Sequence, residues 1–135
     1  MKIAIFTSEE YAFLYGAWRR TIPELRKSHD VVGVWVFPDI LKNLRGLQIP
    51  LWYVRTFGFL TTAALAFRAC STRLAERGSY ESLARSHGIS FHRARTPNAA
   101  EVVQWVKDQQ IDVVLITVGF IIKQPLIEAA RVAVV

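Results

Sequence analysis

The sequence lacks most features that mark secreted, metal-binding or membrane-spanning proteins. Its 135 residues include a single cysteine, Cys70, so no disulfide can form within the chain and no zinc-ligand spacing is present. The longest stretch without a charged residue, 56–67, is shorter than the roughly 20 residues of a membrane-spanning helix. No signal-peptide pattern follows Met1. We therefore expect a cytoplasmic protein without a metal site.

Glycine-rich phosphate-binding loops are also missing. In dinucleotide-binding domains the first strand is followed by Gly-x-Gly-x-x-Gly, which lets the backbone approach a pyrophosphate. Here the first apolar run is followed by Thr7, Ser8, Glu9 and Glu10, and the two carboxylates would repel a phosphate. This argues against a nicotinamide or flavin dinucleotide, and no P-loop is present. Glu9 and Glu10 are typical of a helix N-terminus, and a role in binding substrate is the alternative.

Positive charge is concentrated in one segment. The chain has a net charge of +6, and residues 40–78 contain six basic residues against one acid, Glu76, which gives that segment +5. We interpret 40–78 as a basic, apolar insertion, helical from 52 to 77. One interpretation is a helix packed on a sheet with solvated arginines. The other is an exposed face for self-association or for an anionic surface.

Apolar runs typical of buried strands alternate with helical patterns along the chain. The predicted strands cover residues 3–6, 31–37, 89–91, 112–117 and 132–135, with helical patterns between them. This order predicts an α/β fold: a doubly wound, mostly parallel, Rossmann-like sheet of about five strands with flanking helices. We expect one domain over residues 1–135, incomplete at its C-terminus.

The loop after the fourth predicted strand is a candidate ligand site. In doubly wound sheets, ligands bind beyond the carboxyl ends of the strands. This loop contains Gly119 and Phe120 followed by two isoleucines, so its backbone could hydrogen-bond a flat heterocycle that the apolar side chains flank. An ordinary strand-to-helix turn with a core phenylalanine is the alternative.

Four ordered segments resemble the N-terminal half of the folate-dependent formyltransferases, most closely methionyl-tRNA formyltransferase and the sugar N-formyltransferases. They are residues 1–12, 29–34 with 38–39, 88–91 and 112–120, and the resemblance spans nearly the whole chain except 40–78. It implies 10-formyltetrahydrofolate as the formyl donor. It further implies a pterin pocket lined by Gly119, Phe120, Ile121, Ile122, Lys123 and Gln124, and an acceptor substrate near Thr7, Ser8, Glu9, Glu10 and Tyr11.

The resemblance assigns no catalytic residue within the chain. It implies an asparagine and a histidine directly after Val135 and an aspartate further on, and His29, His87 and His92 do not match the catalytic position. We therefore expect the intact protein to be a formyltransferase acting on a primary amine and residues 1–135 alone to be inactive. The expected acceptor is a nucleotide-linked amino sugar or another small amine. Methionyl-tRNA is less favoured, because the lysine-rich loop of that branch is missing.

Two other classes of function stay open. The basic, aromatic segment would also suit the N-terminal domain of a membrane-associated glycosyltransferase, which would need a second α/β domain after residue 135. A non-catalytic binding module is the third hypothesis.

Overall fold

A computed structural model describes residues 1–10, 14–38, 48–75 and 79–135. Its five strands form one sheet in the order β3-β2-β1-β4-β5, and every neighbouring pair is parallel. The strands are β1 (Lys2–Ser8), β2 (Asp30–Phe37), β3 (Ser90–Arg93), β4 (Val113–Thr117) and β5 (Ala133–Val134). The predicted Rossmann-like α/β fold is confirmed.

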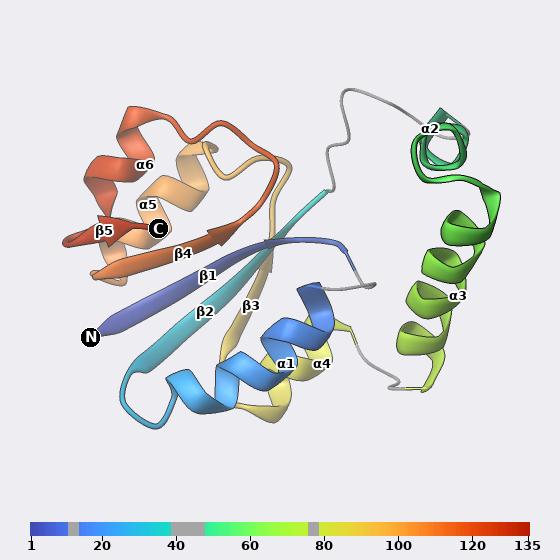
Figure 1. Ribbon diagram of the computed structural model, residues 1–135. Coiled ribbons are helices and arrows are strands. Elements are labelled where there is room, and N and C mark those ends of the chain that lie inside the picture. The colour runs from blue at the N-terminus through green and yellow to red at the C-terminus, as the bar shows by residue number, and fades with distance from the viewer. Residues whose placement is uncertain (11–13, 39–47, 76–78) are drawn as a thin grey trace.

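Helices cover both faces of this sheet (Figure 1). Helices α1 (Leu14–Leu25) and α4 (Tyr80–Ser86) lie on one face, and α5 (Ala100–Asp108) and α6 (Gln124–Ala129) lie on the other. Each pair closes its own apolar cluster, with Trp18 and Tyr80 in the first and Val102 and Leu126 in the second. Alternate residues of β1 and β2 face the two clusters, as expected for strands buried on both sides.

The remaining two helices stand apart from the sheet. Helices α2 (Gln48–Phe57) and α3 (Phe59–Ala75) lie beyond the carboxyl ends of β1 and β2, with α2 across one end of α3 (Figure 1); we call this bent pair the α2–α3 hairpin. We predicted one helix over residues 52–77, and this was wrong in two respects. Gly58 has φ of 82°, a left-handed conformation that breaks the helix, and the helical structure begins at Gln48 rather than at residue 52. Residues 76 and 77, at the end of the predicted helix, lie outside the described residues.

The start of α1 also differs from the prediction. Thr7 and Ser8, residue types that commonly cap helices, both belong to β1, and the helix begins only at Leu14. The Glu10 carboxylate performs the capping role instead, since its Oε2 accepts a hydrogen bond of 2.8 Å from the Leu14 N–H. Pro23 lies inside the helix without ending it; the fully buried Ile22 anchors this last turn against the sheet.

The shorter elements follow the prediction closely. Ser79 caps α4 by accepting a hydrogen bond from the Ser82 N–H at 3.1 Å, and Gly88 follows that helix with φ of 63°. Helix α5 begins at Ala100 rather than at residues 96–98. The ends of the strands differ from the predicted ends by one or two residues.

Gly33 allows β2 to pass close to α5. A Cβ atom at this position would lie 2.7 Å from Cζ2 of Trp105 and 2.6 Å from Oγ of Ser90, distances that real Cβ contacts do not reach. The Trp105 ring is held by Trp35, with 5.6 Å between ring centroids. Glycine at position 33 is therefore required by packing.

We predict that Gly33→Ala lowers the free energy of unfolding by about 1–3 kcal/mol, the usual cost of overpacking a core. The matched control is Gly16→Ala, because a Cβ there meets nothing within 4 Å. Alanine is favoured over glycine inside a helix, so the free energy of unfolding of this variant should rise by about 0.5–1 kcal/mol. Urea denaturation measures both. Equal stabilities of Gly33→Ala and wild type would show that the Trp105 ring moves aside freely.

Candidate functional site

The carboxyl ends of β1 and β4 meet at the point where the strand order reverses, which is where doubly wound sheets bind ligands. The Trp18 indole N–H lies 3.1 Å from Oγ1 of Thr7 and 3.2 Å from Oγ1 of Thr117, and the two hydroxyl oxygens are 3.1 Å apart. Thr7 and Ser8 are buried. These two predicted substrate-binding residues therefore support the site from beneath rather than line an open surface.

Glu9 and Glu10 leave β1 in different roles. The Glu10 carboxylate caps α1, and its backbone carbonyl accepts a hydrogen bond from the Tyr80 hydroxyl at 3.0 Å. The Glu9 N–H donates to the carbonyl of Phe37 at 2.9 Å, which joins the ends of β1 and β2. Glu9 thus points its carboxylate toward the ends of β2 and β3. Tyr11, the last predicted substrate contact, lies outside the described residues.

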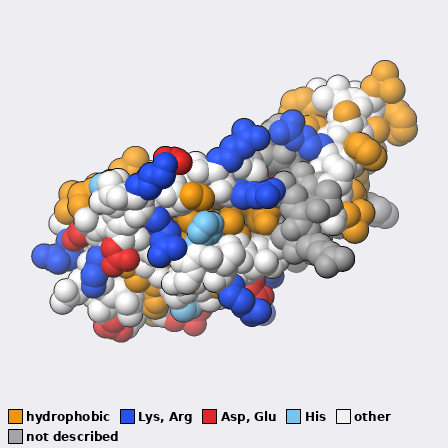
Figure 2. Space-filling view, turned by 90° about the horizontal axis from the view of Figure 1, so that it is seen from below, with side chains coloured by type: hydrophobic (Ala, Val, Ile, Leu, Met, Phe, Trp, Pro, Cys, Tyr) orange, Lys and Arg blue, Asp and Glu red, His pale blue; other side chains and the backbone are white. Residues whose placement is uncertain are grey.

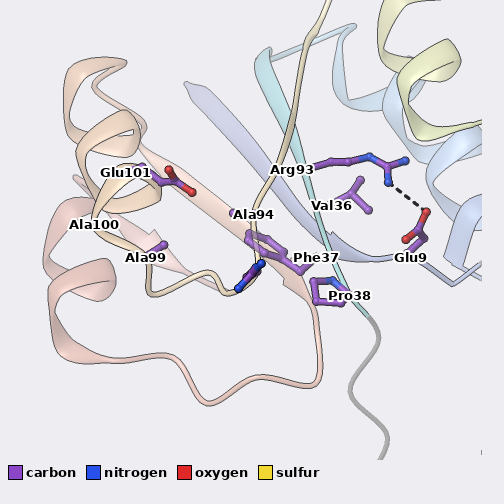
Figure 3. A pocket seen from close by; sticks show the side chains of 10 residues that line it. Glu9, Val36, Phe37, Pro38, Arg93, Ala94, Ala99, Ala100 and Glu101 are labelled. Atoms are coloured by element: carbon purple, nitrogen blue, oxygen red, sulfur yellow. Dashed lines mark hydrogen bonds and ion pairs between the residues drawn. The ribbon is translucent and has the colours of Figure 1, made fainter. Parts of the chain in front are cut away.

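A cavity of about 950 Å³ opens beside these strand ends. Its walls come from the ends of β1, β2 and β3 and from the start of α5 (Figure 3). Of the predicted site residues that the structure describes, Glu9 alone lines it. The full lining is Glu9, Val36, Phe37, Pro38, Arg93, Ala94, Arg95, Ala99, Ala100 and Glu101.

The charged groups of this cavity balance one another. Arg93 and Glu9 form an ion pair on one side of the cavity, with 3.4 Å between Nη1 and Oε1 (Figure 3). Both side chains are partly exposed, at 53% and 37%, so the pair is weak and water-screened. Arg95 and Glu101 add one further charge of each sign. Such a lining suits a polar ligand that carries both an amine and an anionic group.

The loop after β4 is held in place by Asn98. The Asn98 side-chain amide donates to the Ile121 carbonyl at 2.8 Å, and its carbonyl oxygen accepts from the Lys123 N–H at 2.8 Å. These two bonds fix the loop at both ends of Ile122. Gly119, Phe120 and Ile122 make none of the backbone hydrogen bonds found among the described residues.

Side chains of the same loop divide between the core and the surface. Phe120 packs edge-on against Phe37, with 6.2 Å between ring centroids, and Ile122 is half-buried against the same cluster. Ile121 is 88% exposed, and Gly119, Lys123 and Gln124 are exposed. None of the six predicted pterin contacts lines the 950 Å³ cavity. The loop and the cavity nonetheless adjoin, because Phe37 lines the cavity and packs on Phe120 of the loop.

Sequence reasoning missed Asn98, Arg93 and Arg95. An asparagine after Thr96-Pro97 indicates a turn, and nothing in its local pattern points to a partner 25 residues later in the chain. Arg93 is the last residue of β3, an edge strand of four residues, and Arg95 lies two positions beyond it, so alternation gives little signal. The parallel pairing of β2 with β3 brings Arg93 next to Glu9, which no local pattern reveals.

His92 lies in an aromatic cluster next to the cavity wall. Its ring stacks on Trp35 with 4.6 Å between centroids and lies 5.3 Å from Trp105. Its Nε2 atom is buried and has no hydrogen-bond partner. Burial lowers the pKa of His92 below its ordinary value of 6.5, because the charged imidazolium would lose its water.

Comparisons with known proteins give no family for this chain. No protein-family model matches it, and no curated protein resembles it significantly. Within the described residues no group of three His, Cys, Asp or Glu side chains could hold a metal ion. No helix in that part of the chain is both long and apolar enough to cross a bilayer.

We predict that His92 makes stability depend on pH. Its pKa is lower in the folded than in the unfolded chain, so the unfolded chain binds the proton more tightly. The free energy of unfolding therefore falls as pH drops through 6.5 toward the lower folded value. Urea denaturation at a series of pH values measures this slope. His92→Phe keeps an aromatic ring on Trp35 and should flatten the slope, while the other titrating groups are common to both proteins. An unchanged slope would contradict the prediction.

Proposed function

We propose that this chain is the donor-binding, N-terminal part of a formyltransferase that moves a formyl group from 10-formyltetrahydrofolate to a primary amine. The observation that carries the proposal is the loop after β4. It lies at the carboxyl edge of the sheet and Asn98 fixes its backbone. It presents an exposed Ile121 beside peptide groups without partners among the described residues.

The chemistry of this loop fits a pterin. A pterin ring is flat and carries hydrogen-bond donors and acceptors along its edge, so it needs backbone groups at its rim and apolar atoms on its faces. Gly119, Phe120 and Ile122 offer the backbone groups, and Ile121 offers an apolar surface. Lys123 and Gln124 are exposed next to them and would contact the anionic tail of the folate. When bound, the folate supplies the activated formyl group.

The cavity beside Glu9 is the proposed place for the acceptor. A primary amine would be attracted by the Glu9 carboxylate, and a phosphate on the same molecule by Arg93 and Arg95. This favours a nucleotide-linked amino sugar or another small anionic amine over methionyl-tRNA. Thr7 and Ser8 position Glu9 from the buried end of β1.

Formyl transfer needs catalytic groups, and none of these is assigned to residues 1–135. Attack of the amine on the formyl carbon forms a tetrahedral oxyanion, which requires hydrogen-bond donors and a base for the amine proton. His29 and His92 each have a buried ring nitrogen without a partner in the described structure, and His87 ends α4. The proposal therefore gives this part of the protein binding and positioning roles. The proposal also includes a cytoplasmic location. The single cysteine favours this location, because a chain without an internal disulfide suits a reducing compartment.

A second function is favoured by one observation. Helices α2 and α3 expose several large apolar side chains, as expected in the N-terminal domain of a glycosyltransferase that docks on a membrane. That enzyme would bind a nucleotide-linked sugar and no folate.

We predict saturable binding of a stable 10-formyltetrahydrofolate analogue, measured by isothermal titration calorimetry. Ile121→Ala should weaken it about tenfold, because each buried methylene group contributes about 0.8 kcal/mol and the ring covers only part of the side chain. Gly119→Trp should abolish binding by filling the space next to the backbone. Asn98→Ala should weaken binding by releasing the loop.

Ile127→Ala is the matched control, since Ile127 is an exposed isoleucine on α6 outside the loop, and it should bind like wild type. Circular dichroism confirms that each variant is folded. If the folded chain binds no analogue, or if Ile121→Ala and Ile127→Ala behave alike, the loop is not the donor site. Binding of a uridine diphosphate sugar without binding of the folate analogue would favour the glycosyltransferase.

A further inference from the structure

The hairpin formed by α2 and α3 exposes an unusual amount of apolar surface. Leu60, Phe67 and Leu74 of α3 are 83%, 76% and 79% exposed. Phe59 at the start of α3 and Leu51 on α2 are exposed as well. Isolated exposed apolar residues are common, whereas a contiguous set of this size marks an interaction surface. The space-filling view shows these side chains gathered at one end of the molecule (Figure 2).

The exposed residues form one stripe along α3. Leu60, Phe67 and Leu74 are spaced by seven residues, about two helical turns, so they lie on the same face of the helix. Thr62 and Leu65, on another face, are half-buried, and α2 is the helix that packs on α3. The apolar stripe thus faces away from α2, the described helix that packs on α3.

An aromatic cluster extends the apolar surface onto α2. The ring centroid of Trp52 lies 5.2 Å from that of Tyr53 and 5.8 Å from that of Phe57. Tryptophan and tyrosine are enriched where a protein meets the headgroup region of a bilayer, because their rings are apolar and their polar atoms reach water.

Charge identifies the occupant of this surface. Residues 48–75 contain three arginines and no Asp or Glu, and the whole 40–78 segment carries +5 of the chain's +6. The other 96 positions are therefore almost neutral. Arg68 follows Phe67 and so flanks the stripe, and Arg55 lies in the last turn of α2. A partner for this surface must accept apolar side chains and be negatively charged.

We infer that the α2–α3 hairpin is an interfacial docking surface for an anionic phospholipid membrane. A second copy of the chain is a poor occupant, because pairing two hairpins would bring two segments of +5 together. Neither helix is long and apolar enough to span the bilayer. Instead α3 lies in the membrane plane with its stripe among the acyl chains and its arginines at the headgroups.

This orientation has a geometric consequence. The hairpin lies beyond the carboxyl ends of β1 and β2 (Figure 1), the same edge that carries Glu9 and the cavity. Docking through the hairpin therefore turns the candidate site toward the membrane side of the molecule.

Vesicle flotation tests the inference. The chain should float with vesicles of phosphatidylcholine mixed with phosphatidylserine and much less with phosphatidylcholine alone. The double variant Arg55→Gln/Arg68→Gln should lower the partition coefficient about 25-fold, at about fivefold for each arginine near an anionic surface. Raising the salt concentration should weaken binding in the same way. The double variant Leu60→Glu/Phe67→Glu should reduce binding to the level of phosphatidylcholine alone.

Ile127→Glu is the control, since it places the same charge on an exposed isoleucine of α6 and should float like wild type. All substituted side chains are exposed or on the hairpin surface, and circular dichroism checks that the fold is kept. Equal flotation of wild type with both kinds of vesicle, or of wild type and Leu60→Glu/Phe67→Glu, would overturn the inference. A lipid-free dimer that Leu60→Glu/Phe67→Glu dissociates, seen by analytical ultracentrifugation, would instead make a second copy the occupant.

Discussion

The structure is built around β1, the central strand, which is paired on both edges and covered on both faces. Residues 3–8 are all buried, and most of them are apolar. Thr7 and Ser8 are the polar residues among them, and the buried Thr7 hydroxyl needs a hydrogen-bond partner because leaving it unpaired would cost about 1–3 kcal/mol. Trp18 and Thr117 meet that need. The same hydrogen bonds hold α1 and β4 at the carboxyl end of β1. They therefore also fix the geometry of the sheet edge between β1 and β4, where the strand order reverses.

Much of this fold could be predicted because its two central strands, β1 and β2, are buried on both faces and strands of a parallel sheet appear as continuous apolar runs. Residues 31–37 and 112–117 carried that signal clearly. Helix ends were harder, since they depend on single side chains. Helix α1 begins at Leu14, whose N–H is capped by the Glu10 carboxylate. Gly58 lies between α2 and α3, so one apolar segment forms two helices. The packing that requires glycine at position 33 comes from Trp105, which is distant in sequence, so no local pattern could reveal it.

The candidate site was predictable only in part, for a related reason. A glycine and apolar residues after β4 identify a loop at the ligand-binding edge. The partners that shape it come from other segments: Asn98 reaches Ile121 and Lys123 across 23 and 25 positions, and Arg93 meets Glu9 across 84. Such pairs follow from strand order and register, which local sequence does not contain. The loop could therefore be located from the sequence, whereas its supports and the cavity could not.

The loop and the cavity meet at Phe37 and at Asn98–Ala99, which supports treating them as one site. Phe37 lines the cavity and packs on Phe120 of the loop. Asn98, which fixes the loop, immediately precedes Ala99, which lines the cavity. In the proposed function, a folate on Ile121 and an amine acceptor beside Glu9 would thus lie on two sides of the Phe37–Phe120 contact. Two reacting molecules must be held in a fixed relation for formyl transfer to be efficient. That arrangement needs a stiff core beneath it, which the two apolar clusters around β1 and β2 provide.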